Sequence, residues 1–303
     1  MYFGIDTSNY TTSLALFDGE RVIQKKKLLC VKQGERGLRQ SEAVFQHTVN
    51  LPKLLGELEL SGIDAVGVSV TPRNAEGSYM PCFLVGENAA EFLSKGCGAR
   101  LYKTSHQTGH ILAALYSANR LDLVNKKHIA FHLSGGTTEA LLVTPDKENI
   151  INIELIAQSS DLKAGQLIDR TGVMLGMNFP CGKELDLLSQ KSDKDFKIKP
   201  SMKGENCSLS GVENKVKAMI ENGDADEDIA RFVITYICKT VSSMLNALRG
   251  KYGGLPVIFS GGVSSNSLLK KTFENDKSVY FAKPEFSLDN AAGTAIYAYL
   301  KDK

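Results

Sequence analysis

Two of the five histidines in this 303-residue chain stand four residues apart, in the pentad His106-Gln107-Thr108-Gly109-His110. On a helix, residues i and i+4 lie on one face, so both imidazoles can reach one cation. The pentad differs from the HExxH pattern of metalloproteases, in which the glutamate after the first histidine is the general base. Gln107 cannot take that role. Because an isolated pair of this kind is more often incidental, a metal site needs a further ligand from elsewhere.

Asp289 offers this further ligand. It lies at the start of the last expected helix, 289–300, where helix capping alone would explain an aspartate. As a hard oxygen donor it would also complete a two-histidine, one-carboxylate site, which suits Fe and Zn alike. Of the other histidines, His128 and His132 are interpreted as structural, and His47 as packed or solvated within a helix.

Three turns could hold phosphate groups: Asp6 to Asn9, Ser134 to Thr137, and Ser260 to Asn266. Glycine pairs let backbone N–H groups approach an anion, and a helix N-terminus adds a favourable dipole. Each turn alone is more often just a tight turn, but together they indicate a nucleotide site of the actin-like kind, by analogy of fold. Asp169 and Asp186 could bind ribose hydroxyls or orient a cation; the alternative is a solvated carboxylate on a helix.

Alternating strands and helices predict the frame that positions these residues. A strand–turn–strand unit occurs twice, because Thr11–Leu16 aligns with Thr137–Leu142 at an offset of 137 − 11 = 126. The repeat favours two duplicated α/β domains with a central cleft. We expect the first domain to hold 1–104 plus 290–303, and the second to hold 105–289 with the metal and nucleotide-binding loops. The expected helices cover 41–59, 83–94, 110–118, 162–175, 182–190, 211–222, 226–249 and 289–300, with a mobile loop at 191–203.

The composition is that of an ordinary globular protein, with 43% hydrophobic and 23% charged residues. The net charge of +2 neither favours nor excludes a nucleic-acid partner. No run of eighteen apolar residues is present, so we expect no membrane span. The beginning of the chain does not look like a signal peptide, and the six cysteines form no CxxC pair. These features predict reduced thiols and a cytoplasmic location.

In their order along the chain, these motifs resemble the TsaD/Kae family of tRNA threonylcarbamoyl transferases, formerly called Gcp or glycoprotease. The resemblance implies an actin-like ATPase (ASKHA, ribonuclease H-like) fold. It also implies transfer of a threonylcarbamoyl group from its adenylate to the adenosine next to the tRNA anticodon. The segments that carry it are Gly4 to Ser8, the pentad, Ser134 to Glu139, Ala164 to Asp169, Pro180 to Asp186, Leu209 to Gly211, Ser260 to Asn266 and Asp289 to Ala292.

The resemblance also implies site residues. His106, His110 and Asp289 would bind one divalent metal, Fe or Zn, while Mg²⁺ could accompany ATP or ADP. The implied partners are an adenine nucleotide or acyl-adenylate, tRNA, the proteins of a tRNA-modification complex, and a homo- or heterodimer mate. No catalytic residue is assigned. The residues expected to hold the nucleotide or adenylate are Leu133, Ser134, Gly135, Gly136, Thr137, Asp169, Gly182, Asp186, Gly261, Gly262 and Asn266.

The chain departs from the family pattern at Asn9, Tyr10, Arg73, Thr137 and Gln166. We therefore expect a divergent paralogue that keeps its metal and nucleotide groups, with its acceptor and the activity of its altered site left open. Two alternatives are a non-catalytic nucleotide-binding subunit of a tRNA-modification complex and a kinase or ATPase of the same fold. Gln107 gives the old peptidase name no support.

Overall fold

The computed structural model describes residues 1–8, 10–31 and 38–303, so Asn9 lies outside the described residues. The chain folds into two compact units. Unit 1 comprises Met1–Asn125, Thr144–Ile153 and Glu285–Lys303. Unit 2 comprises Lys126–Val143 and Glu154–Pro284.

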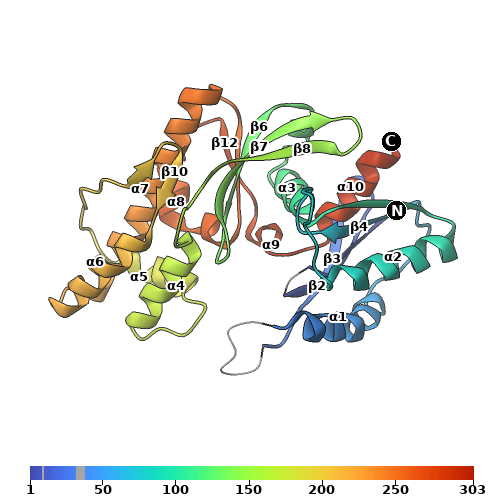
Figure 1. The fold of residues 1–303 in the computed structure, drawn as a ribbon, viewed down its shortest axis with the longest axis horizontal. Coiled ribbons are helices and arrows are strands. Elements are labelled where there is room, and N and C mark those ends of the chain that lie inside the picture. The colour runs from blue at the N-terminus through green and yellow to red at the C-terminus, as the bar shows by residue number, and fades with distance from the viewer. Residues whose placement is uncertain (9, 32–37) are drawn as a thin grey trace. The chain divides into compact units, whose positions relative to one another are not determined.

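The two five-stranded sheets have the same strand order (Figure 1). The first runs β3-β2-β1-β4-β5, and the second, read in the same sense, runs β8-β7-β6-β11-β12. In the first sheet, the central strand β1 pairs antiparallel with β2 and parallel with β4. In the second sheet, the central strand β6 pairs antiparallel with β7 and parallel with β11. This repeat confirms the duplicated α/β fold. The strands are β1 (Tyr2–Asp6), β2 (Thr11–Phe17), β3 (Val22–Leu28), β4 (Ala65–Thr71), β5 (Arg100–Ser105), β6 (His128–Leu133), β7 (Thr138–Asp146), β8 (Ile150–Gln158), β11 (Val257–Ser260) and β12 (Val279–Phe281).

In unit 1, helix α10 packs directly on β1 and β4 because both strands carry a glycine beneath it. A Cβ atom on Gly4 would overlap the carbonyl oxygen of Ala291, and one on Gly67 would overlap that of Thr294. Phe3, Ile5 and neighbouring aliphatic side chains fill the core of the unit. Its helices are α1 (Gln40–Leu55), α2 (Phe83–Cys97), α3 (His106–Ser117) and α10 (Ala292–Asp302), with a short 3-10 turn at Leu121–Asn125.

Helices α3 and α10 meet backbone to backbone, because Gly109 and Gly293 face each other. A Cβ atom on Gly293 would overlap the carbonyl oxygen of Gly109. This contact places α3 and the last segment of the chain together in unit 1. The observed division therefore differs from the expected domains, 1–104 plus 290–303 and 105–289: the pentad and Asp289 lie in unit 1, and the expected nucleotide residues lie in unit 2.

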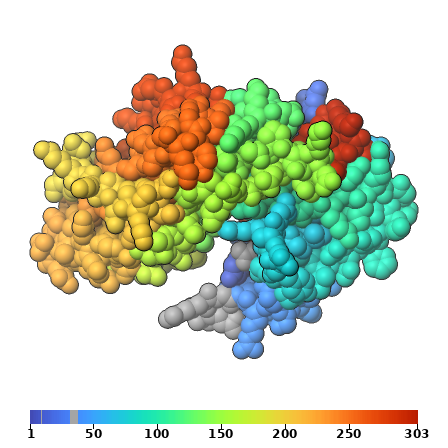
Figure 2. Space-filling model, turned by 45° about the horizontal axis from the view of Figure 1, so that its top comes forward, coloured from blue at the N-terminus to red at the C-terminus, as the bar shows by residue number. Residues whose placement is uncertain are grey.

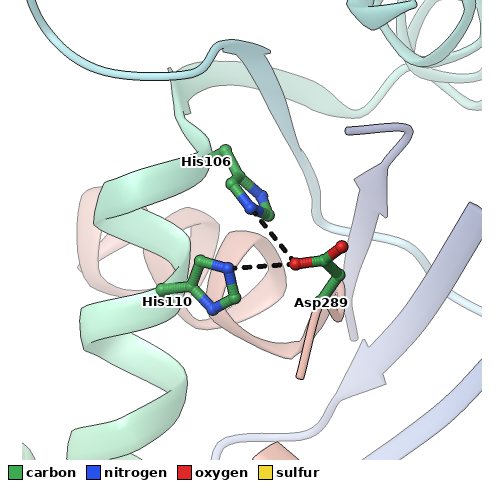
Figure 3. Close-up of side chains that lie close together, drawn as sticks. All are labelled: His106, His110 and Asp289. Atoms are coloured by element: carbon green, nitrogen blue, oxygen red, sulfur yellow. Dashed lines mark ion pairs between the residues drawn. The ribbon is translucent and has the colours of Figure 1, made fainter. Parts of the chain in front are cut away.

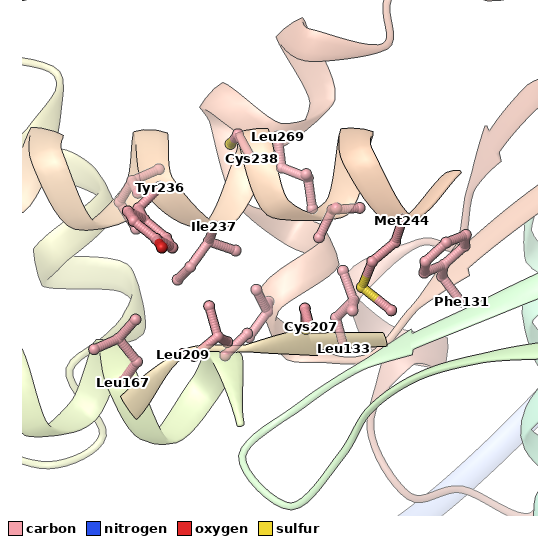
Figure 4. Packing of buried hydrophobic residues seen from close by; sticks show 14 of the residues in the cluster. Phe131, Leu133, Leu167, Cys207, Leu209, Tyr236, Ile237, Cys238, Met244 and Leu269 are labelled. Carbon is pink, nitrogen blue, oxygen red and sulfur yellow. The ribbon is translucent and has the colours of Figure 1, made fainter. Parts of the chain in front are cut away.

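Unit 2 is built around helix α7, which contributes the largest share of a single apolar core. Figure 4 shows Met244 of α7 next to Phe131 of β6, and both belong to this core. Acidic residues in the first turn of α7 and basic residues in its last turn suit the helix dipole. The helices are α4 (Ala164–Met174), α5 (Gly182–Ser189), α6 (Ser210–Glu221), α7 (Asp226–Tyr252) and α8 (Ser267–Thr272), and a hairpin joins β9 (Ser201–Lys203) to β10 (Asn206–Ser208).

Two local expectations change. The helix of the pentad begins at His106, not His110, because Ser105 caps it by accepting the N–H of Thr108. The predicted loop 191–203 ends in strand β9, and the segment is largely exposed on unit 2 (yellow in Figure 2). No helix among the residues that the structure describes is long and apolar enough to cross a membrane.

Candidate metal centre and nucleotide pocket

The pentad forms the first turn and a half of α3, immediately after β5. Its two imidazoles therefore project from one face of the helix, as the i, i+4 spacing predicts. The centroids of the His106 and His110 rings are 4.2 Å apart, with the rings inclined at 72°. A helix fixed at its first residue holds this pair more rigidly than a loop could.

Asp289 completes the cluster from the opposite end of the sequence (Figure 3). Its Oδ1 atom lies 3.5 Å from Nε2 of His106 and 3.3 Å from Nε2 of His110. The expectation that Asp289 caps the last helix is wrong. Helix α10 begins at Ala292, and the side chain of Asn290 accepts the N–H of Ala292 instead, which leaves Asp289 to face the histidines.

These three side chains fit a transition-metal ion. One donor atom from each lies within 4.8 Å of the others, and both imidazoles present the same nitrogen, Nε2, toward one carboxylate oxygen. Two imidazoles and one carboxylate are ligands of Fe(II) and of catalytic Zn(II), which keep further positions for water or substrate. The three side chains are 13–24% exposed, so the cluster is partly open to solvent.

A second carboxylate, Asp6, contacts His106 at Nδ1, the ring nitrogen that does not face Asp289. It is fully buried at the end of β1, and its Oδ2 atom lies 2.8 Å from Nδ1 of His106. Burial would by itself lower the pKa of His106, but the charge of Asp6 and the hydrogen bonds to Asp289 and Asp6 raise it to about 10. Burial would by itself raise the pKa of Asp289, but the hydrogen bonds from His106 and His110 hold that pKa well below its usual range.

The sequence interpretation missed this role of Asp6. It treated Asp6 only as part of a turn after the first strand. No local pattern could have found this role, because it depends on β1 pairing with β4 and on β4 pairing with β5, which leads directly into the pentad.

In unit 2, the ends of two parallel strands and one helix meet at the edge of the sheet. Gly261, with φ of +91°, follows β11, and a Cβ atom there would overlap the carbonyl oxygen of Leu133 at the end of β6. The N–H of Gly165, in the first turn of α4, donates to the carbonyl oxygen of Ser134. A Cβ atom on Gly165 would stand 2.6 Å from the backbone nitrogen of Gly135. Gly261 and Gly165 therefore allow the backbone after β11 and the start of α4 to pack directly against the backbone at the end of β6.

These turns border a cavity of about 440 Å³. The cavity is a suitable size for a nucleotide-like ligand. Lys183 and Ser265, which the sequence interpretation did not select, also line it, as do Gly165, Ile168, Pro180 and Val263. Among the described residues, the predicted ligands in its wall are Gly135, Asp169, Gly182, Asp186, Gly262 and Asn266; those outside it are Leu133, Ser134, Gly136, Thr137 and Gly261.

The two carboxylates of the cavity differ in their partners. Asp186 accepts hydrogen bonds from the amide of Asn266 and from the backbone and hydroxyl of Ser267, so it fastens the start of α8. Asn266 in turn caps α8 by accepting the N–H of Leu269. Asp169 accepts one backbone N–H, from Cys181, through Oδ1, and burial raises its pKa. Of the two, Asp169 keeps more capacity to accept a ligand hydroxyl.

The departures from the family pattern have local structural roles. Thr137 closes the β6–β7 turn, because its N–H donates to the hydroxyl of Ser134. Gln166 accepts the N–H of Lys163 at the start of α4. Arg73 lies in the loop after β4, where its N–H donates to Ser78. Tyr10 is exposed before β2.

A family model described as "TsaD: tRNA N6-adenosine threonylcarbamoyltransferase" matches residues 31–296. A protein of that name from Thermosipho africanus is 28% identical over 321 residues, covering 98% of this chain and 92% of the relative. Another of the same name, from Kosmotoga olearia, is 28% identical over 272 residues, covering 86% of this chain and 80% of the relative.

Solved structures share the fold at low identity. Component A of the (R)-2-hydroxyglutaryl-CoA dehydratase of Acidaminococcus fermentans has a TM-score of 0.57 at 18% identity, covering 99% of this chain and 98% of its own. The ROK hexokinase of Thermus thermophilus has a TM-score of 0.53 at 13% identity, covering 100% of this chain and 99% of its own. These neighbours establish the actin-like ASKHA fold.

Proposed function

Because this chain belongs to the TsaD family of tRNA N6-adenosine threonylcarbamoyltransferases, we propose that it transfers a threonylcarbamoyl or related carbamoyl group from an adenylate to an adenosine acceptor. The observation that carries the proposal is the meeting of His106, His110 and Asp289 in a chain matched by that family over 31–296. In the sequence, Asp289 lies 179 residues after His110, yet its carboxylate faces both imidazoles. We propose that this cluster holds one divalent metal ion.

The metal, when bound, would supply a Lewis acid for the carbamoyl oxygen. His106 and His110 would hold it through Nε2, and Asp289 through a carboxylate oxygen. In unit 2, the backbone around Gly135 and Gly262 would take the phosphate, and Asp169 would accept a ribose hydroxyl. Asp186 and Asn266 would keep the cavity wall in shape, because their side-chain bonds bind α8 to α5.

Two departures from the family pattern bear on the choice of acceptor. Thr137 and Gln166 replace the histidine and glutamate of the family pattern, and both close backbone turns beside the cavity. Neither offers a titratable group to the ligand. We propose that the adenylate is still accepted, and an adenosine in tRNA is the first acceptor to test.

The direct test supplies threonylcarbamoyl-adenylate, unmodified tRNA and the partner proteins of a tRNA-modification complex to the purified protein. Modified adenosine is measured by mass spectrometry of the digested tRNA. The wild-type protein is expected to form it, and Asp289→Ala is expected to reduce it to background. Asp302→Asn is the matched control, because its buried carboxylate lies in the same unit and accepts bonds from Tyr2, Arg100 and Tyr102 and from none of the three cluster residues.

The outcomes separate the alternatives. Modification that continues in Asp289→Ala would favour a nucleotide-binding subunit without catalysis. ATP turnover with a sugar or acid acceptor, and no modified adenosine, would favour a kinase or ATPase. Either result would overturn the transferase proposal.

A further inference from the structure

Asp6 contacts His106, a predicted metal ligand, at Nδ1, whereas Asp289 faces Nε2 of the same ring. It is 0% exposed, and both of its oxygens have partners. Oδ2 faces Nδ1 of His106 at 2.8 Å, and Oδ1 accepts the backbone N–H of Ser8 at 2.8 Å and the hydroxyl of Ser8. A buried charge is costly unless it is paired and hydrogen-bonded, and for Asp6 the bonds from Ser8 and His106 offset that cost.

The geometry points to Asp6 as the positioning residue of the metal centre, an inference that rests on the proposed metal site. A carboxylate on Nδ1 holds the ring proton there, so Nε2 keeps its lone pair for a metal. It also stops the ring from rotating about its χ2 angle. His106 Nε2 is thereby directed to the point that Asp289 and His110 share.

The turn that carries Asp6 is fastened on its other side. The hydroxyl of Thr7 donates to the carbonyl oxygen of Cys82 at 3.0 Å and accepts the N–H of Gly86 at 3.0 Å, which ties the turn to α2. Ser8 closes the turn on Asp6 itself. The chain of contacts therefore runs from α2 through the turn and Asp6 to His106, and Asp6, Thr7 and Ser8 are buried.

Charge supports the same assignment. Two neutral imidazoles with the carboxylates Asp6 and Asp289 carry two negative charges, which balance a divalent ion. A serine–histidine–aspartate nucleophile made from Ser8, His106 and Asp6 is the competing interpretation. It fails because Ser8 is 1% exposed and its hydroxyl donates to Asp6, while its distance to Nε2 of His106 is 3.5 Å. No substrate carbonyl can reach that oxygen.

The test uses the full chain, stripped with a chelator and titrated with Zn²⁺ by calorimetry and with Co²⁺ by visible absorption. Asp6→Asn keeps the shape of the side chain but can present an N–H to the imidazole, which favours the wrong tautomer. It is expected to weaken Zn²⁺ binding by about 10- to 100-fold and to shift the Co²⁺ bands. Long-range ¹H–¹⁵N spectra of the zinc-loaded wild type should place the His106 proton on Nδ1.

Asp302→Asn is the matched control. Its carboxylate is 5% exposed in the same unit and accepts bonds from Tyr2, Arg100 and Tyr102, away from the cluster. This variant should keep the wild-type Zn²⁺ affinity and Co²⁺ spectrum. Equal affinities and spectra for Asp6→Asn and wild type would overturn the inference.

Should Asp6→Asn fail to fold, Ser8→Ala decides, because it removes one donor to Asp6 and keeps the carboxylate. Its Zn²⁺ affinity should fall about threefold to tenfold, and an unchanged affinity would overturn the inference. A wild-type protein that binds no stoichiometric Zn²⁺ would overturn the proposed metal site and the inference together, whereas stoichiometric binding with no effect at Asp6 and Ser8 would overturn the inference alone.

Discussion

The two candidate sites use the same duplicated sheet in different ways. In unit 1, the turn after the first strand carries Asp6, and the site consists of charged side chains from β1, α3 and the segment before α10. In unit 2, the equivalent turn carries Ser134 to Thr137, and the site consists largely of glycines, backbone groups and capped helix ends. One copy of the unit has become a side-chain site and the other a backbone site.

The difference predicts how each site fails. A side-chain site loses its ligand when a single donor is removed, and the fold survives. A backbone site is insensitive to most side chains but sensitive to any Cβ atom where two backbones touch. Substitutions of site residues in unit 1 should therefore lower mainly ligand affinity. Substitutions that add a Cβ atom at the glycine contacts of unit 2 should lower mainly stability.

The largest effect is expected for His110→Ala in unit 1. Loss of one of three protein ligands should lower metal affinity by more than about 100-fold, beyond the effect of a residue that only orients a ligand. Elemental analysis of the purified proteins measures it, with one metal per wild-type chain and background in the variant. Nucleotide affinity, measured in parallel, should stay within about twofold. Equal metal content in both proteins would remove the assignment.

Adjacent glycines give the matched pair for unit 2. Gly261→Ala should lower the free energy of unfolding by about 2–4 kcal/mol, because φ is +91° and the new Cβ atom would overlap Leu133. Gly262→Ala meets nothing within 4 Å and should leave stability within about 0.5 kcal/mol. Since Gly262 lines the cavity, its variant should instead bind nucleotide more weakly.

Urea unfolding of both variants checks this pair, together with fluorescence titration of an adenine nucleotide. Similar stability losses at the two positions would contradict the view that backbone contact, rather than glycine content, shapes this edge of the sheet.

Substitution of the two cavity carboxylates should affect different properties, stability for Asp186 and nucleotide affinity for Asp169. Asp186→Asn should lower the free energy of unfolding by about 1–2 kcal/mol, because hydrogen bonds from Asn266 and Ser267 lose a charged acceptor. Asp169→Asn should leave stability equal or slightly higher at pH 7, since burial disfavours the charge of Asp169 and raises its pKa. Its nucleotide affinity should fall about tenfold. Thermal unfolding and nucleotide titration measure both, and a reversed order would exchange the two roles.

The smallest effect concerns an ion pair of unit 2 outside the cavity. Asp276 accepts from Arg249 at 2.7 Å and from Ser278, and the hydrogen bond from Arg249 lowers its pKa to about 2. A depressed carboxyl pKa adds stability above the unfolded pKa near 3.9, and that stability is lost as the pH falls toward 2. Because the pair is 27% exposed, Asp276→Asn should cost only about 1 kcal/mol at pH 7.

Unfolding of this variant and wild type between pH 7 and pH 2 measures the difference, which should vanish at the acid end. A constant difference at all pH values would show that shape or packing, not charge, is lost.

Much of the frame could be predicted from the sequence, because periodicity and glycine turns are local signals. The offset between Thr11–Leu16 and Thr137–Leu142 predicted the repeat, and the strand orders confirm it. The pentad predicted two imidazoles on one helix face, which the start of α3 at His106 confirms. The assignment of its metal remains a proposal.

The rest depended on contacts between distant segments. The role of Asp6 needs β1 beside β4 and β4 beside β5, a pairing that no local pattern encodes. Asp289 looked like a helix cap because three small residues follow Asn290, yet the helix begins at Ala292 and leaves it outside. The assignment of Asp186 as a ligand group stays a prediction, and its structural bonds could not be predicted, because Asn266 and Ser267 lie 80 and 81 residues further along the chain.

The position of α10 also sets the order in which the protein can assemble during its synthesis. The glycines of β1 and β4 are shaped to receive α10, and unit 1 draws on Glu285–Lys303. A ribosome makes that segment only after the whole of unit 2. Synthesis of unit 1 therefore starts before that of unit 2 but ends after it. The His106–His110–Asp289 cluster can form only after all of unit 2 has been translated.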